Sequence, residues 1–231
     1  DGLRVYPLAE ADDPPAMEFP SLSERSFNTI HANDFSFYEE LDRVIQREPV
    51  GVIDPETRGL LASIGIRKGT PFAPDERMRG LLTEAAAVAN ATARAIAFDT
   101  RDPGAPIFPD RHWKTGFIGN DFQWLSDAGV GGRNLDARTM FFYLATVNTP
   151  AMALRMPGVG SQYAIADHDS GGAFLDGGRR YSLTLPADVP ANDFWSIVVY
   201  DPQTRSELQT GQAFPSRNSV RDHLATGADG S

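Results

Sequence analysis

Helices precede strands along this sequence, and that order predicts an α+β protein. Before residue 150, apolar residues recur at helical spacing in several segments. After residue 151, short apolar stretches are separated by turns that contain Gly or Pro. We therefore expect an extended arm and a helical region over residues 1–150 and an antiparallel β-sandwich over residues 151–231. Whether the two regions form one continuous domain stays open.

Two helices are predicted early in the helical region. In NDFSFYEELDRVIQREP, either Asn33 or Asp34 can cap a helix that ends before Pro49. In DPETRGLLASIGI, Asp54 is the capping residue, a proline takes the first helical position, and Gly65 closes the helix. Residues 1–30, which contain several prolines, are expected to be extended and irregular.

The longest helix is predicted over residues 74–98, and a further helix runs from near Asn134 to just before Pro150. The long helix has one apolar stripe, and its alanines indicate close approach to a neighbouring element. The stripe consists of Met78, Leu81, Leu82, Ala85, Ala89, Ala93 and Ile96.

Short strands are predicted in the C-terminal region. SQYAIAD reads as a strand, and Tyr181, Leu183 and Leu185 alternate with polar residues, which indicates one buried face. The run FWSIVVY is apolar at nearly every position, which suits a strand in the core of a sandwich. The chain stops on Asp229-Gly230, a common hairpin pair, without a returning strand, so we expect the sandwich to be incomplete.

Composition and charge exclude several classes of function. The chain has 231 residues, no cysteine and a net charge of −10. An acidic chain repels phosphate backbones, which argues against nucleic-acid partners. No apolar run is long enough to span a bilayer. Without cysteine, disulfides and thiolate metal sites are excluded.

The loop DPQTRS, which follows the FWSIVVY run, is the first candidate site. Asp201 and Arg205 can pair across the turn, and Gln203, Thr204 and Ser206 add donors and acceptors. Such a pair can orient a substrate or shift the pKa of the carboxylate. It can equally hold the loop in place, and the structural role is favoured. Asp201 and Arg205 are the candidate catalytic residues.

Further candidate binding residues are aromatic or cationic. Trp113 and Lys114 offer an aromatic plane beside a cation, although a partly buried Trp with a solvent-reaching Lys is an equal alternative. Tyr200 ends the FWSIVVY run, and Arg138 lies on a helix that is otherwise expected to be core. With Gln203, these residues are the predicted ligand contacts.

Metal and cofactor motifs are weak. DHDSGG places Asp167 and Asp169 at calcium-loop spacing, but Gly178 stands where an EF-hand needs a bidentate Glu. A polar turn is the favoured interpretation of this segment. The histidines, at positions 31, 112, 168 and 223, show no ligand spacing. We predict no metal and no cofactor.

Several long strings resemble bacterial proteins that pair the domain-of-unknown-function families 1254 and 1214. They are RSFNTIHANDFSFYEELD, LDARTMFFYLATVNTPAMA, LDGGRRYSLTLPADVPANDFWS and FWSIVVYDPQTRSELQTGQAFPSRNS. The resemblance covers essentially the whole chain, with the last two strings in the 1214-like part.

This resemblance implies a jelly-roll β-sandwich with helices packed beside it. Family chains are longer at both ends, which implies a fragment lacking the N-terminal module and the last strands. The sequence itself leaves open whether Asp1 and Ser231 are native ends. Members often carry an export signal, so the resemblance implies a periplasmic or extracellular parent protein. It implies no reaction and no catalytic residue.

Three functions compete. The first is an envelope-associated sandwich that binds a small molecule or carbohydrate, with rings supplied by Trp113, Trp124, Trp195 and Tyr200. The second is a hydrolase that uses Asp201, with Arg205 or Lys114 stabilising negative charge. The third is a structural or interaction module, in which an exposed apolar patch would favour a homo-oligomer. Whether the protein is an enzyme stays open.

Overall fold

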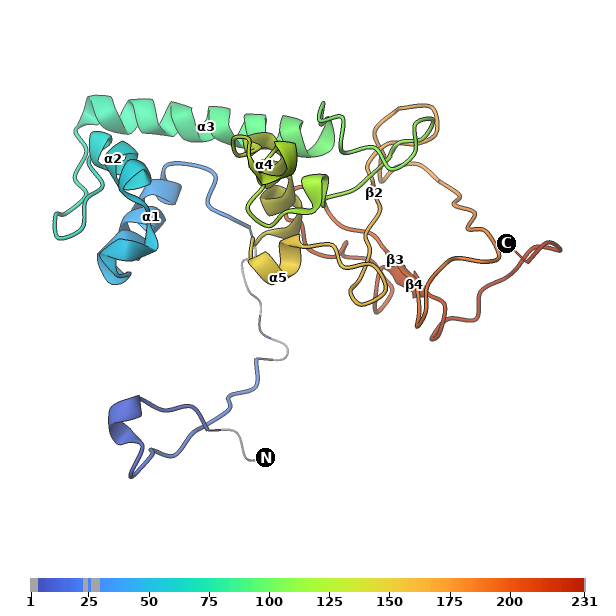
Figure 1. Cartoon of the computed structure of the whole chain (residues 1–231), viewed down its shortest axis with the longest axis horizontal. Helices are drawn as coiled ribbons and strands as arrows, with labels where there is room; N and C mark the ends of the chain where they lie inside the picture. Colours follow the sequence, from blue (N-terminus) through green and yellow to red (C-terminus); the bar gives the residue numbers. More distant parts are fainter. Residues whose placement is uncertain (1–3, 23–24, 26–29, 231) are drawn as a thin grey trace.

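The structure is a computed structural model that describes residues 4–22, 25 and 30–230 (Figure 1). It has a mixed α+β fold, as predicted. The helices are α1 (Ser36–Arg47), α2 (Pro55–Ser63), α3 (Glu76–Phe98), α4 (Leu135–Ala145) and α5 (Pro150–Ala153). The strands are β1 (Trp113–Lys114), β2 (Ile165–Ala166), β3 (Ser196–Val198) and β4 (Ser216–Asn218), and single 3₁₀ turns lie at Leu8–Glu10, Val50–Val52, Ile118–Asn120 and Asp127–Gly129.

Side-chain caps begin four of the helices, α2 to α5. The carboxylate of Asp54 accepts a hydrogen bond from the backbone N–H of Thr57 at the start of α2, and Asp75 caps α3 in the same way. Asn134 accepts from the backbone N–H of Ala137 at the start of α4. Each cap satisfies a donor that the first helical turn leaves free. The predicted cap at Asp54 is therefore confirmed, as is the predicted helix start near Asn134, whereas the N-cap of α1 is Phe35 and not Asn33 or Asp34.

Helix α3 spans two separate hydrophobic cores, as its long course across Figure 1 shows. Its first half packs with α1 and α2 around Tyr38 and Ile66, and its second half packs with α4 around Met140 and Phe141. Between the cores, Ala85 and Ala89 are exposed, as is Leu81. The predicted apolar stripe is therefore wrong at these three positions, because the buried face of α3 runs through Leu82 and Ala86.

Helix α4 is shorter than predicted. It ends at Ala145 because Thr146 adopts a left-handed conformation with φ of 64°. The chain then restarts as the short helix α5, with Thr149 as its cap and Pro150 in its first turn.

The strands form two separate antiparallel pairs. Trp113 of β1 pairs with Ala166 of β2, and Ile197 of β3 pairs with Arg217 of β4. Within the described ranges, these pairs join no larger sheet. The stretch that contains Tyr181 and Leu183 is exposed and is not part of a strand.

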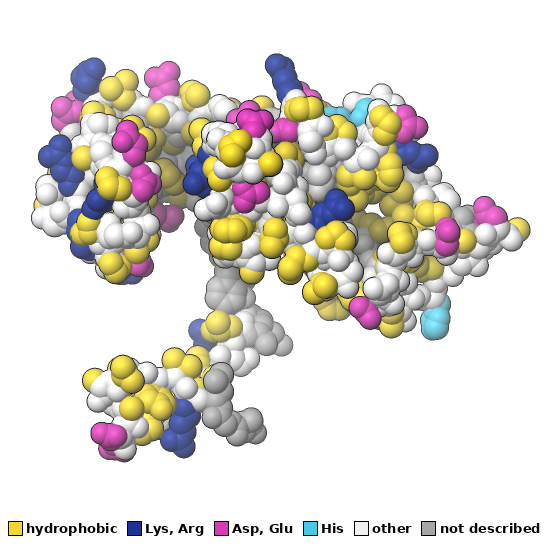
Figure 2. Space-filling view, in the orientation of Figure 1, with side chains coloured by type: hydrophobic (Ala, Val, Ile, Leu, Met, Phe, Trp, Pro, Cys, Tyr) yellow, Lys and Arg dark blue, Asp and Glu magenta, His cyan; other side chains and the backbone are white. Residues whose placement is uncertain are grey.

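The FWSIVVY run is not the buried core strand that its composition predicts. Only Ser196–Val198 is a strand, while Phe194 and Tyr200 are 60% and 57% exposed. A two-stranded pair can cover only a narrow strip, so the flanking residues stay in contact with solvent. Hydrophobic side chains accordingly reach the surface around α5, β3 and β4 (Figure 2).

The predicted extended arm is described in part. Residues 4–22 contain one 3₁₀ turn, and the backbone N–H of Val5 lies 3.3 Å from Sδ of Met17. Residues 1–3, 23–24 and 26–29 lie outside the described residues, as does the terminal Ser231. Among the helices described, none has the length and apolar character needed to cross a bilayer.

Candidate functional site

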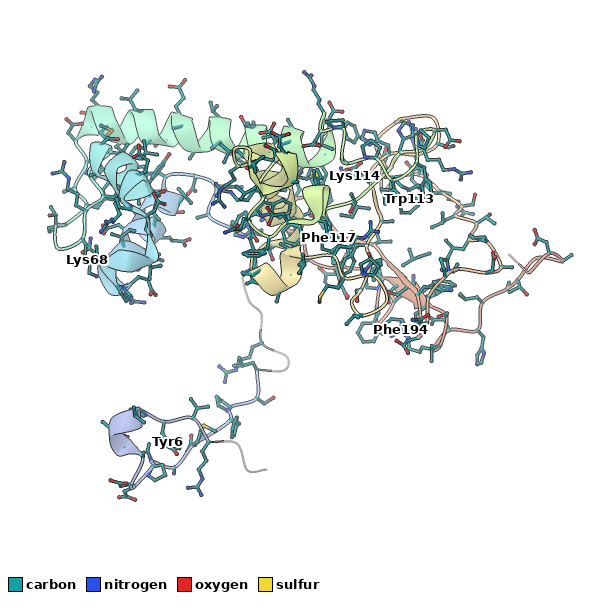
Figure 3. The ribbon with its side chains drawn as sticks, viewed as in Figure 1. Tyr6, Lys68, Trp113, Lys114, Phe117 and Phe194 are labelled. Atoms are coloured by element: carbon teal, nitrogen blue, oxygen red, sulfur yellow. The ribbon has the colours of Figure 1, made fainter. Side chains whose placement is uncertain are left out.

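A pocket of about 300 Å³ lies between the C-terminal end of α3, the β1–β2 pair and the turn after β2. Figure 3 shows Trp113 and Lys114 side by side in this region. The pocket combines apolar and charged groups, and its wall includes Phe98, Pro106, Trp113, Lys114, Asp167 and His168. We call it the Lys114 pocket.

Lys114 is the buried cation of this pocket, with only 6% of its surface exposed. Its ammonium donates to the backbone oxygen of Ala97 at 2.6 Å, near the end of α3, where the helix dipole favours a cation. It also donates to Oδ2 of Asp167, and it lies 5.8 Å from the ring centroid of Phe98. An ammonium has three donors, so these bonds leave one N–H for a ligand.

Asp167 links Lys114 to His168. Its second oxygen, Oδ1, lies 2.8 Å from Nδ1 of His168, and both side chains are largely buried, at 16% and 17% exposure. The imidazole packs against Phe174, with ring centroids 4.1 Å apart, and lies 5.9 Å from the ring of His112. The result is a fixed row of an ammonium, a carboxylate and an imidazole along one wall of the pocket.

Local backbone structure explains how Asp167 and His168 are positioned at the pocket. Asp167 and His168 follow β2 directly, and the chain then turns through Gly172, which has φ of 81°. Asp169 Oδ1 accepts from the backbone N–H groups of Gly171 and Ala173 at 2.9 and 3.0 Å. DHDSGG is thus a polar turn that holds His168. No group of three or more metal-ligating side chains occurs in the part of the chain that the structure describes.

The loop after β3 uses Asp201 to support its own backbone. Oδ1 of Asp201 accepts from the N–H groups of Gln203 and Thr204 at 2.7 and 2.9 Å. These bonds hold the pKa of the Asp201 carboxyl below its usual value of 3.8, and the bond from Thr204 has the largest effect on that pKa. The ion pairs found among the described residues do not include one between Asp201 and Arg205.

Arg205 points away from Asp201 and toward the helical region. Its Nη2 lies 2.5 Å from Nδ1 of His31, and its guanidinium lies 4.5 Å from the ring centroid of Tyr143 on α4. Arg94 of α3 donates to Oε1 of Gln203 at 3.0 Å and to the hydroxyl of Tyr143 at 3.3 Å. These contacts dock the loop onto α3 and α4.

One aromatic side chain joins the docked loop to the Lys114 pocket. Phe98 contacts Tyr143 edge-on, with ring centroids 5.8 Å apart, and its ring is also the one that faces Lys114. The two regions singled out from the sequence are therefore neighbours across α3. Only the Lys114 side of Phe98 opens into the pocket.

The other predicted residues are scattered. Tyr200 is exposed beside Glu207, and partial burial followed by the charge of Glu207 raises its pKa. Arg138 is exposed on α4. Trp124 is 2% exposed and packs against Phe141, so it belongs to the core and cannot stack on a ligand.

A larger pocket, of about 430 Å³, lies between α1 and α2. Its wall is mostly aliphatic but also includes Glu48, Arg58, Arg67 and Lys68. Lys68 is exposed, and its ammonium donates to the backbone oxygens at the end of α1. The larger pocket is favoured by size, but the Lys114 pocket is the one with a buried ammonium paired to a carboxylate.

The C-terminal part of the chain is similar to a known protein family. Residues 160–231 match the family model described as "Protein of unknown function (DUF1214)". We call these residues, which are similar to that family, the DUF1214 region. No curated protein matches the chain.

The DUF1214 region supplies only part of the Lys114 pocket. Asp167 and His168 lie within it, as does the loop that contains Asp201 and Arg205. Lys114, Phe98 and the docking residues of α3 and α4 precede it. The pocket is thus completed by residues outside the matched DUF1214 region.

Asp167 and His168 were not among the predicted site residues. In the sequence they stand next to each other directly after a short apolar stretch, which is only a weak indication of a site. Their partner Lys114 is 53 residues from Asp167, and β1 and β2 are two residues each. Sequence spacing alone could not reveal the cluster.

Proposed function

We propose that the protein binds a small molecule that carries an oxyanion or carbonyl oxygen, in the Lys114 pocket. The observation that supports this is the buried ammonium of Lys114, whose three donors find two acceptors among the described residues. A ligand oxygen can accept the third N–H. In a site shielded from water, such a charge-assisted bond contributes about 1.5–3 kcal/mol.

The rest of the wall favours a ligand with an apolar body. Phe98, Pro106 and Trp113 supply apolar surface, while the ion pair with Asp167 leaves the buried centre close to neutral. Small-ligand sites combine apolar surface with a few placed polar groups, and the wall of this pocket offers both kinds of surface. A small aromatic or aliphatic carboxylate fits both parts, and benzoate is a suitable probe.

Benzoate binding, measured by calorimetry, tests the proposal. Lys114→Met should weaken binding by about 10- to 100-fold, because one charge-assisted bond is lost. The sequence has one other lysine, and Lys68→Met is the matched control that should leave affinity unchanged. Asp201→Ala tests the competing site in the loop, and it should lower stability without changing affinity.

Two further variants and probes make the result decisive. Thr100→Phe places a ring in the pocket wall and leaves Lys114 paired, so it should also abolish binding, even if Lys114→Met is too unstable to assay. Benzyl alcohol and glucose, which lack a carboxylate, should bind more weakly than benzoate. Equal affinity of all four variants for benzoate would rule out this pocket.

The resemblance supports a wider setting for the chain. In this proposal the β1–β2 and β3–β4 pairs belong to a jelly-roll sandwich that a longer 1254/1214 protein completes, and that protein is periplasmic or extracellular. Osmotic-shock fractionation of cells that produce the full gene product tests the location. Release with the cytoplasm would count against it.

Exposed apolar side chains support self-association of this chain. Phe194, Val199, Tyr200 and Phe214 are each at least half exposed in the DUF1214 region. Large exposed apolar side chains that gather on one surface favour association. Light scattering should give a mass above 25.2 kDa that falls toward that value when Phe194 and Tyr200 are both changed to Ser. A monomer at all concentrations would contradict this.

A further inference from the structure

We infer that the Lys114 pocket is catalytic, and that His168 acts there as general base and then general acid in the hydrolysis of a small carboxylic ester. This rests on the proposed function, because the same pocket and the same Lys114 donor would hold the ester carbonyl. It adds a reaction and a named proton carrier.

The first argument is the orientation of His168. Its Nδ1 faces Oδ1 of Asp167 at 2.8 Å, and a carboxylate there accepts a hydrogen bond from Nδ1–H. In the neutral imidazole the proton is then on Nδ1, and Nε2 keeps its lone pair. A carboxylate that fixes the tautomer in this way is the orienting partner in Ser-His-Asp sites.

The second argument is that the carboxylate is itself held from the other side. Oδ2 of Asp167 receives the Lys114 ammonium, whose position is fixed by the backbone oxygen of Ala97. The imidazole is packed against Phe174, with ring centroids 4.1 Å apart. An acid–base group placed this firmly loses little free energy to reorientation during a proton transfer.

The third argument concerns the charge that develops during ester hydrolysis. Attack on a carbonyl carbon moves an electron pair onto the carbonyl oxygen, and that oxyanion needs a donor. Lys114 has one N–H not used by Ala97 or Asp167. The base and the oxyanion donor are therefore joined through one carboxylate, on the wall of one pocket.

The reaction balances with water as the only co-reactant. Nε2 of His168 takes a proton from water while the water oxygen bonds to the carbonyl carbon, and the oxyanion accepts from Lys114. The tetrahedral intermediate then re-forms the C=O bond as the C–O bond to the alcohol breaks. The leaving alkoxide takes the proton from Nε2, which releases a carboxylic acid and an alcohol and restores neutral His168.

Steady-state hydrolysis of 4-nitrophenyl acetate by the whole chain tests this step, with calorimetric benzoate binding measured on the same samples. His168→Asn keeps a side-chain N–H in place of Nδ1–H and removes the base. It should lower kcat/KM by at least about 100-fold and leave benzoate affinity within a few-fold, since general acid–base groups contribute about 10²–10⁴ in rate. His223→Asn, at an exposed histidine outside the pocket, is the matched control and should keep most of the activity.

The outcomes separate the two proposals. Lys114-dependent benzoate binding without hydrolysis above the buffer rate would overturn the catalytic inference and leave the binding function in place. Hydrolysis that His168→Asn does not slow would also overturn it. Failure of benzoate to bind the wild-type pocket, with no hydrolysis, would overturn both. If His168→Asn does not fold, His168→Gln carries the same comparison.

Discussion

Replacing Lys114 by Met is expected to destabilise the protein by about 3–5 kcal/mol in urea titrations followed by circular dichroism. The substitution preserves most of the side-chain volume but removes the charge that faces Asp167. Asp167 is then left as a largely buried carboxylate whose remaining side-chain partner is His168. Losing one member of a buried pair is costly, because the other charge keeps its desolvation penalty without its partner.

The double variant Lys114→Met, Asp167→Leu measures the interaction between the two charges apart from their other contacts. Removing both charges abolishes the unpaired carboxylate, so we expect the double variant to be more stable than Lys114→Met alone. Lys68→Met is the comparison for an exposed lysine that bonds to helix-end carbonyls, and it should cost no more than about 1 kcal/mol. A double variant as unstable as the sum of its singles would mean that Lys114 and Asp167 do not interact.

The cap at Asp54 and the helix start near Asn134 were predictable because the chemistry of a cap is local. Asp54 lies three residues before the N–H that it accepts from, and Asn134 has the same spacing to Ala137. A short polar side chain next to a helical segment is sufficient to place such an end. The early end of α4 escaped prediction because the turn at Thr146 is left-handed in a non-glycine residue, which sequence patterns do not favour.

Strand burial was not predictable, because it depends on what covers the strand. FWSIVVY has the composition of a fully buried strand, yet only Ser196–Val198 forms a strand, which pairs with β4, while Tyr200 makes an isolated bridge to Glu207. An apolar composition shows only that a strand would be stable when buried. Whether another layer covers the strand depends on the tertiary structure. The same limit applies to Tyr181 and Leu183, which alternate like a strand but stay exposed.

The candidate site was predicted in halves. Trp113 and Lys114 were singled out as an aromatic ring beside a cation, and Lys114 proves to be buried and ion-paired, so the alternative of a solvent-reaching lysine is wrong. Asp201 and Arg205 were chosen as a pair, but each bonds elsewhere. Charge spacing along the loop could not reveal that the guanidinium of Arg205 bonds to His31, which is 174 residues away.

Trp124→Ala is expected to cost about 3–5 kcal/mol of stability, the second large effect. Trp124 was considered from the sequence as a ring for stacking on a sugar, but it fills the core between the loop after α3 and Phe141. Its backbone is also engaged, since its oxygen accepts from the N–H of Asn134 at 2.6 Å. Truncation would leave a cavity under α4 that the surrounding helices can only partly fill.

Trp124→Phe gives the sharper comparison in the same urea titrations. The smaller ring loses packing area, but it also removes the indole Nε1–H, which is buried and lacks a hydrogen-bond acceptor among the described residues. Relief of that unpaired donor, worth about 1–3 kcal/mol, should offset much of the lost packing. Trp195→Ala, at a partly exposed ring, should cost less than Trp124→Ala. If Trp124→Ala instead kept full stability and lost affinity for glucose, the ring would be a ligand contact and its assignment to the core would be wrong.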